Sequence, residues 1–203
     1  VARIALSGGG TPSEAYQRLA ALALPWEQTE WFWVDERAVA PDHPRSNYGA
    51  ARRDLAAARV PEGHFFRMEG ESPDLAEAAA RYERLLRARF GVASPVAFDL
   101  MTLGIGDDGH TASLFPGTGA VGIEDRLVAA IPAQPDKGLE ARLTLTAPVI
   151  REARMKLLLA RGSGKRGVLE QAKRTGPADE VPARVVRGGA GRLVWLLDSA
   201  AAG

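Results

Sequence analysis

The chain lacks cysteine and is poor in histidine, and both shortages narrow the chemistry it can perform. Its 203 residues include no cysteine and three histidines. Without cysteine there is no disulfide framework and no thiolate nucleophile. No second histidine lies at metal-ligand spacing, and aspartates alone make at most a weak site for a hard cation. The sequence therefore predicts that no metal is bound.

Long apolar runs and an excess of charge of one sign are also absent. No apolar stretch approaches the roughly 20 residues that cross a bilayer, and the N-terminal residues VARIALSGGG do not match a cleavable signal. The formal net charge of +1 creates no strong field for nucleic acid or an anionic membrane. With 46% hydrophobic and 25% charged residues, we expect one soluble, cytoplasmic domain over residues 1–203.

Short apolar, β-rich runs alternate with helical patterns along the chain. Such alternation is typical of βαβ units and predicts an α/β fold with a parallel sheet. Strands are expected at residues 1–6, 31–34, 96–103, 126–131, 142–146, 155–160 and 192–197. Helices are expected at residues 12–24, 46–59, 74–90, 147–153 and 165–174.

The connection SGGGTPSEAY, residues 7–16, contains more glycine than a tight turn requires. Glycines let backbone N–H groups approach a ligand, and a helix N-terminus attracts anions through its free amides and its dipole. Thr11 is expected as the N-cap residue, with Pro12 at the first helical position and Glu14 completing a capping box. We interpret residues 8–11 as a phosphate-binding loop, although a well-capped tight turn is the structural alternative.

Asp35, Glu36 and Arg37 directly follow a predicted buried strand, where parallel α/β sheets bind ligands. Arg37 can clamp a phosphate or a carboxylate with its guanidinium fork. The alternative is structural, with Asp35 or Glu36 pairing with Arg37 or capping the next segment. Ser46 or Asn47 is expected to cap the next helix, and Asn47 can also donate to a ligand hydroxyl.

The segment LGIGDDGHTASLFPG, residues 103–117, formally contains a dinucleotide motif. GIGDDG at 104–109 matches G-x-G-x-x-G, and Glu124 lies at a plausible distance for a ribose contact. The Pro-Gly pair at 116–117 leaves no room for the long helix that follows a dinucleotide loop. We therefore favour a sharp turn that presents polar side chains at the sheet edge.

That turn places His110 two positions after Asp108. An imidazole beside a carboxylate on a stiff turn can act as a general base near neutral pH. A lone histidine more often makes a local structural hydrogen bond, but here two phosphate-compatible loops end neighbouring strands of one predicted sheet. We predict that His110 is catalytic, whereas His43 is expected to be an exposed loop histidine and His64 to be structural.

Two later stretches add basic residues. Arg142 begins a predicted strand and is expected to be a surface or site residue. Lys165 and Arg166 are expected in the first turn of a helix, where positive charge opposes the helix dipole. A bound anion would explain this arrangement, and so would two solvated basic residues tolerated at a small cost.

Together these motifs resemble those of 6-phosphogluconolactonases, in the glucosamine-6-phosphate deaminase/6-phosphogluconolactonase family. The resemblance covers most of the chain and rests on SGGGTP at 7–12, DER at 35–37, SNY at 46–48, GIGDDGHTASLFP at 104–116 and RLT at 142–144. The related deaminases have DEY in place of DER and IAFNE after the Gly-His pair, so this chain is more similar to the lactonases. Family members usually carry a further helix before the first strand, and the short N-terminus departs from that pattern.

The resemblance implies a modified Rossmann-type fold with helices on both faces of a mainly parallel sheet. It also implies hydrolysis of 6-phospho-D-glucono-1,5-lactone to 6-phospho-D-gluconate, in the oxidative pentose phosphate pathway, without a dinucleotide or a metal. His110 would activate water and Asp108 would orient its imidazole. The substrate-binding residues would be Ser7, Gly8, Gly9, Gly10, Thr11, Asp35, Arg37, Asn47, Gly106, Arg142 and Lys165.

Within that set, the phosphate would lie among residues 9–11, Arg37 and Lys165, with Arg142 a weaker candidate. Backbone amides of the glycine turns or Arg37 would stabilise the oxyanion. We expect a monomer or homodimer that acts on a small sugar phosphate and binds neither nucleic acid nor membranes. Two alternatives stay open: a sugar-phosphate isomerase or deaminase, and a sugar-phosphate sensor without catalysis.

Overall fold

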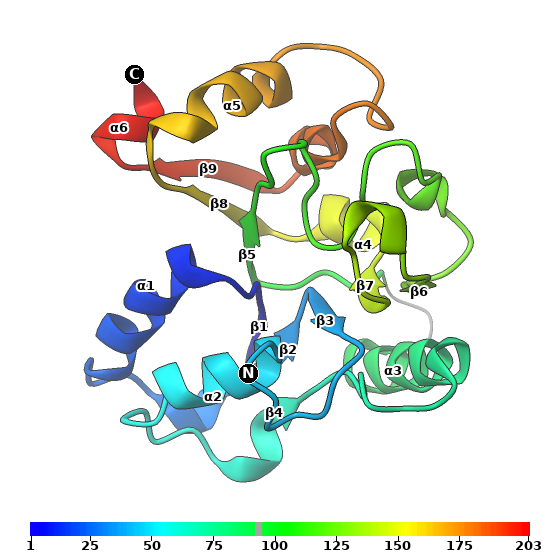
Figure 1. The fold of residues 1–203 in the computed structure, drawn as a ribbon. Coiled ribbons are helices and arrows are strands. Elements are labelled where there is room, and N and C mark those ends of the chain that lie inside the picture. The colour runs from blue at the N-terminus through cyan, green and yellow to red at the C-terminus, as the bar shows by residue number, and fades with distance from the viewer. Residues whose placement is uncertain (92–94) are drawn as a thin grey trace.

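A parallel sheet of six strands forms the centre of the computed structural model, which describes residues 1–91 and 95–203 (Figure 1). In spatial order the strands are β4 (Phe65–Phe66), β2 (Thr29–Trp33), β1 (Ala2–Leu6), β5 (Leu100–Gly104), β8 (Met155–Ala160) and β9 (Arg192–Leu197). The helices are α1 (Gly10–Ala20), α2 (Asn47–Asp54), α3 (Leu75–Phe90), α4 (Ala147–Glu152), α5 (Arg166–Lys173) and α6 (Ser199–Ala202). None of the described helices is long and apolar enough to cross a membrane.

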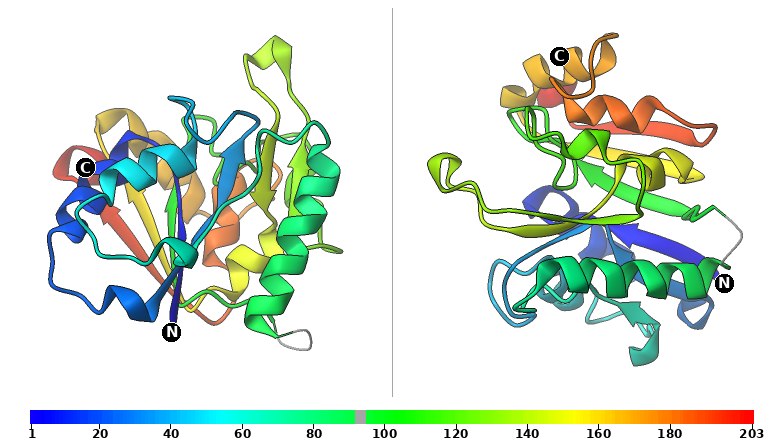
Figure 2. Two further views of the ribbon diagram at one scale, coloured as in Figure 1. Left: turned by 90° about the horizontal axis from the view of Figure 1, so that it is seen from below. Right: turned by 90° about the vertical axis from the view of Figure 1, so that its right-hand side faces the viewer.

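Different helices cover the two faces of this sheet (Figures 1 and 2). In β2, Trp31 and Trp33 pack in one hydrophobic cluster with residues of α1 and α2, whereas Phe32 packs in another cluster with residues of α3. The split follows from the strand's period of two, which sends successive side chains to opposite faces. The predicted α/β fold, with a mainly parallel sheet and helices on both faces, is confirmed.

A second, antiparallel sheet contains β3 (Asp35–Arg37), β7 (Arg142–Leu145) and β6 (Val128–Ile131) in that order. The strands predicted at 126–131 and 142–146 are therefore present, but they lie outside the central sheet, and Figure 2 shows their connection projecting from the molecule. The sequence did not predict β3, because three consecutive polar residues carry no apolar alternation. Val34 joins the two sheets, since its N–H donates to the Leu6 carbonyl and its carbonyl accepts from the Leu145 N–H.

The order of the strands creates a switch point between β1 and β5. From β1 the chain runs outward through β2 to β4, and from β5 it runs outward on the other side through β8 to β9. The connections at the carboxyl ends of β1 and β5 therefore diverge, and a crevice opens between them. The glycine loop at 7–11 and the turn at 104–110 follow these two strands.

Several predicted boundaries are wrong by a few residues. The structure has α1 from 10 to 20 instead of 12–24, α2 from 47 to 54 instead of 46–59, β5 from 100 to 104 instead of 96–103, and α5 beginning at Arg166 instead of Lys165. Such ends depend on tertiary packing, which the local pattern does not contain.

The predicted capping box of α1 is also wrong. The N-cap residue is Gly9, with a φ of 101°, and no described side chain caps this end. The helix starts at Gly10, one residue before Thr11, and the positive φ of the N-cap position suits glycine. Glu14 instead pairs with Arg18 at 2.6 Å and lies 3.6 Å from Arg161.

Glu36 closes the N-terminus of α2. Its carboxylate accepts from the backbone N–H groups of Asn47 and Tyr48 at 2.8 Å each and from the Ser46 hydroxyl at 2.9 Å. The first N–H groups of a helix lack partners within the helix and attract negative charge. Burial raises the pKa of Glu36 even though these donors favour the carboxylate. The structural alternative is therefore correct for Glu36, and Ser46 is the N-cap residue.

Replacing Glu36 with Gln should destabilise the fold by about 2–3 kcal/mol, because an amide NH₂ would face N–H groups that need an acceptor. Urea unfolding at neutral pH measures the change, with the exposed Glu27→Gln as the control. A free energy of unfolding within about 0.5 kcal/mol of the parent would contradict the role assigned to Glu36.

Candidate active site

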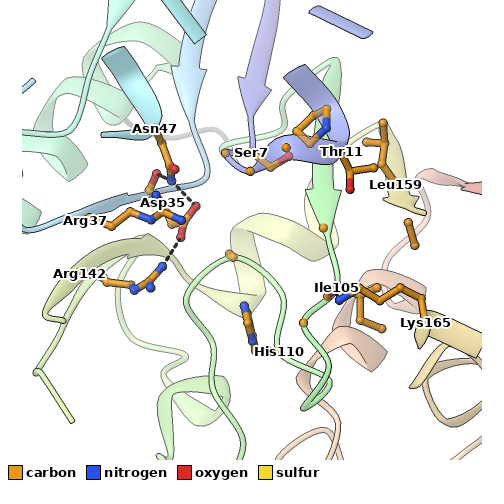
Figure 3. Close-up of a pocket in the computed structure, with 18 residues that line it drawn as sticks. Ser7, Thr11, Asp35, Arg37, Asn47, Ile105, His110, Arg142, Leu159 and Lys165 are labelled. Carbon is orange, nitrogen blue, oxygen red and sulfur yellow. Dashed lines mark hydrogen bonds and ion pairs between the residues drawn. The ribbon is translucent and has the colours of Figure 1, made fainter. Parts of the chain in front are cut away.

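A cavity of about 210 Å³ lies at the carboxyl ends of β1 and β5 (Figure 3). Its lining comprises Ser7, Gly8, Gly9, Gly10, Thr11, Pro12, Asp35, Arg37, Asn47, Gly104, Ile105, Gly106, His110, Ala112, Arg142, Leu159, Ala160 and Lys165. Every residue predicted to bind substrate is in this set, together with His110. Asp108 does not line the cavity and contacts His110 instead.

The glycine loop forms one wall of the cavity. The N-terminus of α1 opens there at Gly10, so free N–H groups and the positive end of the helix dipole favour an anion. Gly8 has a different role, since a Cβ at this position would lie 1.8 Å from Oδ1 of Asn47. Only glycine allows the loop after β1 to pack this closely against the Asn47 side chain.

Two buried hydrogen bonds hold the backbone of Ser7, and a third joins the two side chains that make them. Its N–H donates to Oγ1 of Thr102 at 2.9 Å, and its carbonyl accepts from the Tyr16 hydroxyl at 3.0 Å. The Tyr16 and Thr102 oxygens are 2.6 Å apart, which closes the ring. Burial raises the pKa of Tyr16 to about 12, so its hydroxyl stays protonated. Sequence reasoning missed Tyr16 and Thr102, because nothing local connects residues so distant along the chain.

The histidine turn sets the imidazole against a carboxylate. Nδ1 of His110 is 2.6 Å from Oδ1 of Asp108, and the same oxygen accepts from the His110 backbone N–H at 3.1 Å. A carboxylate only accepts, so Nδ1 donates the hydrogen to Asp108, and in the neutral imidazole the lone pair is then on Nε2. Burial raises the pKa of Asp108, but hydrogen bonds and charge from His110 outweigh it and hold the pKa below its usual value.

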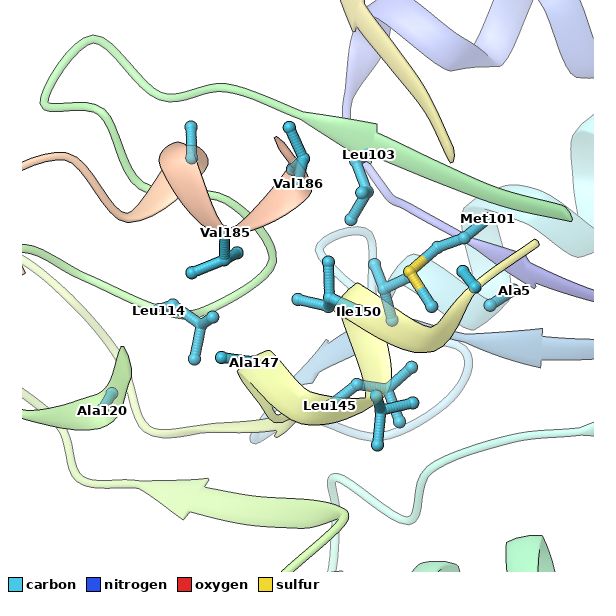
Figure 4. Packing of buried hydrophobic residues seen from close by; sticks show 14 of the residues in the cluster. Ala5, Met101, Leu103, Leu114, Ala120, Leu145, Ala147, Ile150, Val185 and Val186 are labelled. Atoms are coloured by element: carbon cyan, nitrogen blue, oxygen red, sulfur yellow. The ribbon is translucent and has the colours of Figure 1, made fainter. Parts of the chain in front are cut away.

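Two glycines give the turn its shape. Gly109 has a φ of 87°, and its N–H donates to the Gly106 carbonyl at 3.0 Å. The imidazole lies directly over Gly106, where a Cβ would be 2.1 Å from Nδ1 of His110 and 2.7 Å from Oδ1 of Asp108. After the turn, Leu114 is fully buried in the main hydrophobic cluster and anchors the segment (Figure 4).

Asp35 lies in a buried polar network on the opposite wall. Its Oδ1 accepts from Nδ2 of Asn47 at 3.0 Å, and its Oδ2 accepts from the Ser113 hydroxyl at 2.6 Å. The Asn47 amide also donates to the Asp35 carbonyl at 2.9 Å, and its own Oδ1 is buried without a partner among the described residues. Ser113 was not predicted as a site residue. Both carboxylate oxygens of Asp35 are therefore engaged.

Arg37 and Arg142 bring two guanidinium groups to this wall. Nη1 of Arg37 donates to the Arg45 carbonyl at 2.6 Å, and Nη1 of Arg142 lies 3.8 Å from Oδ2 of Asp35. The Nε atoms of both site arginines are buried without partners in the described part of the chain. Burial lowers the pKa of Arg142; nearby Asp35 opposes this shift and Arg37 adds to it. The wall thus presents positive charge that the protein itself compensates incompletely.

Lys165 lies across the cavity from Arg37 and Arg142, as Figure 3 shows. It ends a short 3₁₀ turn before α5, not in the helix's first turn as predicted. Its Nζ donates to the Ile105 carbonyl at 2.8 Å and to Asp107 at 2.6 Å. Asp107 is strongly exposed, so this ion pair leaves Lys165 available to a ligand anion.

Other residues considered for ligands lie away from the cavity. Glu124, the candidate ribose contact, pairs with Arg151 at 2.6 Å and does not line the cavity. Arg166 donates to the Ala200 carbonyl at 2.7 Å. Nδ1 of His64 lies 2.8 Å from the Thr29 carbonyl, a structural contact. Over residues 1–91 and 95–203, no three His, Asp or Glu side chains are grouped as metal ligands.

Replacing Gly106 with Ala should disrupt the His110–Asp108 pair without unfolding the protein, because the added methyl group would occupy the position of the imidazole. We expect catalytic activity to fall about 10²-fold, the order of loss typical of a misplaced acid–base group. Gly122→Ala is the matched control, since its Cβ would meet nothing within 4 Å. Equal activity of both variants would show that Gly106 does not determine the imidazole's position.

Comparison with known proteins identifies the family. A family model described as glucosamine-6-phosphate isomerases/6-phosphogluconolactonase matches residues 1–195. The 6-phosphogluconolactonases of Synechocystis sp. and Homo sapiens are 43% and 38% identical, over 98% of this chain and 82% and 79% of theirs.

Solved structures agree with this assignment. The 6-phosphogluconolactonase from Thermotoga maritima is similar with a TM-score of 0.84 and 32% identity, over 97% of this chain and 84% of that one. A monomeric glucosamine-6-phosphate deaminase shares the fold at a TM-score of 0.82 and 23% identity, over 99% of this chain and 87% of that one. The chain belongs to the glucosamine-6-phosphate isomerase/6-phosphogluconolactonase family.

Proposed function

We propose that this chain hydrolyses 6-phospho-D-glucono-1,5-lactone to 6-phospho-D-gluconate, with His110 as the general base. The observation that carries the proposal is the hydrogen bond from His110 to Asp108, which leaves Nε2 without a partner among the described residues, at a cavity lined by cations. Its relatives in Synechocystis sp. and Homo sapiens are named 6-phosphogluconolactonases, which supports this reaction. We further propose a cytoplasmic monomer or homodimer that binds neither nucleic acid nor membranes.

His110 performs both proton transfers in this mechanism. Nε2 takes a proton from water as the water oxygen bonds to the lactone carbonyl carbon, and the carbonyl electron pair moves onto its oxygen. When the tetrahedral intermediate collapses, the bond to the ring oxygen breaks and the imidazolium protonates that oxygen. Asp108 holds Nδ1 and stabilises the imidazolium. The acid product then ionises and releases a proton to solvent.

The cations and the glycine loop hold the substrate in this proposal. The 6-phosphate lies against the N-terminus of α1 and Lys165, with Arg37 facing it across the cavity. Asn47 lines the same cavity, and its amide holds Asp35 in position there. This assignment supplies anionic partners to polar groups that would otherwise remain incompletely compensated.

The hydrogen bonds made by the carboxylates of Asp35 and Glu36 favour hydrolysis over an isomerase or deaminase reaction. Those reactions need a carboxylate that removes a proton beside a carbonyl. Asp35 has both oxygens engaged by Asn47 and Ser113, and Glu36 is bound to the N-terminus of α2. A sensor without catalysis would need neither a free Nε2 nor the Asp108 contact.

Proton release from freshly generated 6-phosphogluconolactone, above the spontaneous rate, tests the reaction. His110→Asn should lower kcat/KM by about 10²- to 10⁴-fold, whereas His64→Asn, away from the cavity, should not. Because a general base must be unprotonated and the lowered pKa of Asp108 keeps that carboxylate ionised, the parent rate should fall on acidification. A rate that stays flat from about pH 5 to 8 would contradict a base of this kind.

Lys165→Met should raise KM for the phosphorylated lactone about 10-fold or more, since a charged hydrogen bond is worth roughly 1.5–3 kcal/mol, while kcat changes little. The control is Lys173→Met, which removes an exposed lysine that pairs with Glu170 and does not line the cavity. Steady-state kinetics at constant ionic strength separates KM from kcat. An unchanged KM would remove Lys165 from the phosphate site.

A further inference from the structure

Arg142 is a largely buried cation that its described neighbours compensate incompletely. Its side chain is 13% exposed, its Nε has no hydrogen-bond partner among the described residues, and Oδ2 of Asp35 lies 3.8 Å from Nη1, beyond hydrogen-bond range. That Asp35 oxygen already accepts from Ser113 at 2.6 Å. A guanidinium group withdrawn from water needs compensation, so this arrangement calls for negative charge that enters or develops in the cavity.

Arg142 and His110 both pack on the ring of Phe115. The imidazole of His110 packs on the Phe115 ring with 4.6 Å between centroids, and Cζ of Arg142 lies 5.4 Å from the same centroid. Phe115 is 2% exposed and cannot move independently of the core. The guanidinium and imidazole are therefore held at a set separation, and both face the cavity (Figure 3).

The other cations differ from Arg142 in position or commitment. Lys165 and the N-terminus of α1 lie on the far side of the cavity from it. One terminal nitrogen of Arg37 donates to the Arg45 carbonyl. Among the cations lining the cavity, Arg142 thus packs on Phe115 beside His110, and its guanidinium group makes no hydrogen bond to the described residues.

We propose that Arg142 is a catalytic residue that donates hydrogen bonds to the lactone carbonyl oxygen as it becomes an oxyanion, and that it does not hold the 6-phosphate. The inference rests on the proposed lactone hydrolysis and adds the electrophilic group to it. As the water oxygen bonds to the carbonyl carbon, one electron pair moves onto the carbonyl oxygen and its charge faces Arg142. When the ring C–O bond breaks, that pair restores the carbonyl, now part of the product's carboxyl group.

This role predicts a loss that does not depend on the substrate's phosphate. A donor to the oxyanion acts mainly in the transition state, so its removal lowers kcat and leaves KM nearly unchanged. A phosphate ligand would instead affect KM, and only for the phosphorylated lactone. The same variant assayed on both lactones therefore distinguishes the two roles.

The experiment compares the parent and Arg142→Met on 6-phosphogluconolactone and on glucono-1,5-lactone, which lacks the phosphate. We expect kcat on the phosphorylated lactone to fall about 10²- to 10³-fold, with KM within about threefold, and kcat/KM on the plain lactone to fall by a similar factor. Arg45→Met is the matched control, because Arg45 pairs with Glu140 outside the cavity lining. Arg142→Lys, which keeps the charge without the planar guanidinium, should lose less activity than Arg142→Met.

The other outcomes of this experiment would each contradict the proposed role of Arg142 or the proposed function. A loss confined to the phosphorylated lactone, carried by KM, would make Arg142 a phosphate ligand, and full activity of Arg142→Met would remove it from the reaction. Urea unfolding reports whether each variant is folded, and Arg142→Lys replaces Arg142→Met in both assays if the latter is not. If the parent accelerates hydrolysis of neither lactone, the proposed function itself fails, which is distinct from failure of the assignment of Arg142.

Discussion

The parallel pairing of β1 with β5 is the constraint on which the site depends. Ile4 pairs with Leu100 and Ala5 with Met101, which brings the glycine loop and the histidine turn to the same edge of the sheet. The hydrogen bond from the Ser7 N–H to Thr102 extends this contact beyond the strand pairing. Because the chain diverges from these two strands in opposite directions, no crossover fills the space between their ends. The cavity is a direct consequence of the topology.

The antiparallel sheet supplies the charged side chains of the cavity's second wall. It carries Asp35, Arg37 and Arg142 into the opposite wall, with Asp35 beside Thr144 in the register of β3 and β7. Four buried side-chain nitrogen or oxygen atoms have no partner within the described residues, and three of them belong to cavity residues: Arg37, Asn47 and Arg142. The fourth is Nε1 of Trp33, outside the cavity lining, and the other buried side-chain polar atoms of the described residues have partners, as is usual in protein interiors. Buried polar atoms without partners are therefore concentrated in residues that line the cavity.

Close packing explains why some positions accept one residue type. Gly106 leaves room for the imidazole, and Gly8 leaves room for Asn47. The sequence showed that these loops are rich in glycine, and it indicated an anion site after β1. It did not show which side chain packs against each glycine, because that depends on how the folded chain brings the segments together. The failed capping box has the same origin, since the conformation of Gly9 is set by the loop and not by Thr11.

By itself, the sequence determined the features that local chemistry controls. Period-two and helical patterns specified an α/β fold, and the spacing of Asp108 and His110 placed a carboxylate beside an imidazole on one short turn. Tertiary structure alone decided the partners of residues far apart in the chain: Glu36 at the N-terminus of α2, Thr102 beneath Ser7, and Phe115 between His110 and Arg142. Local motifs persist because their atoms are joined by a few bonds. Long-range contacts exist only once burial of the strands has brought separate segments together.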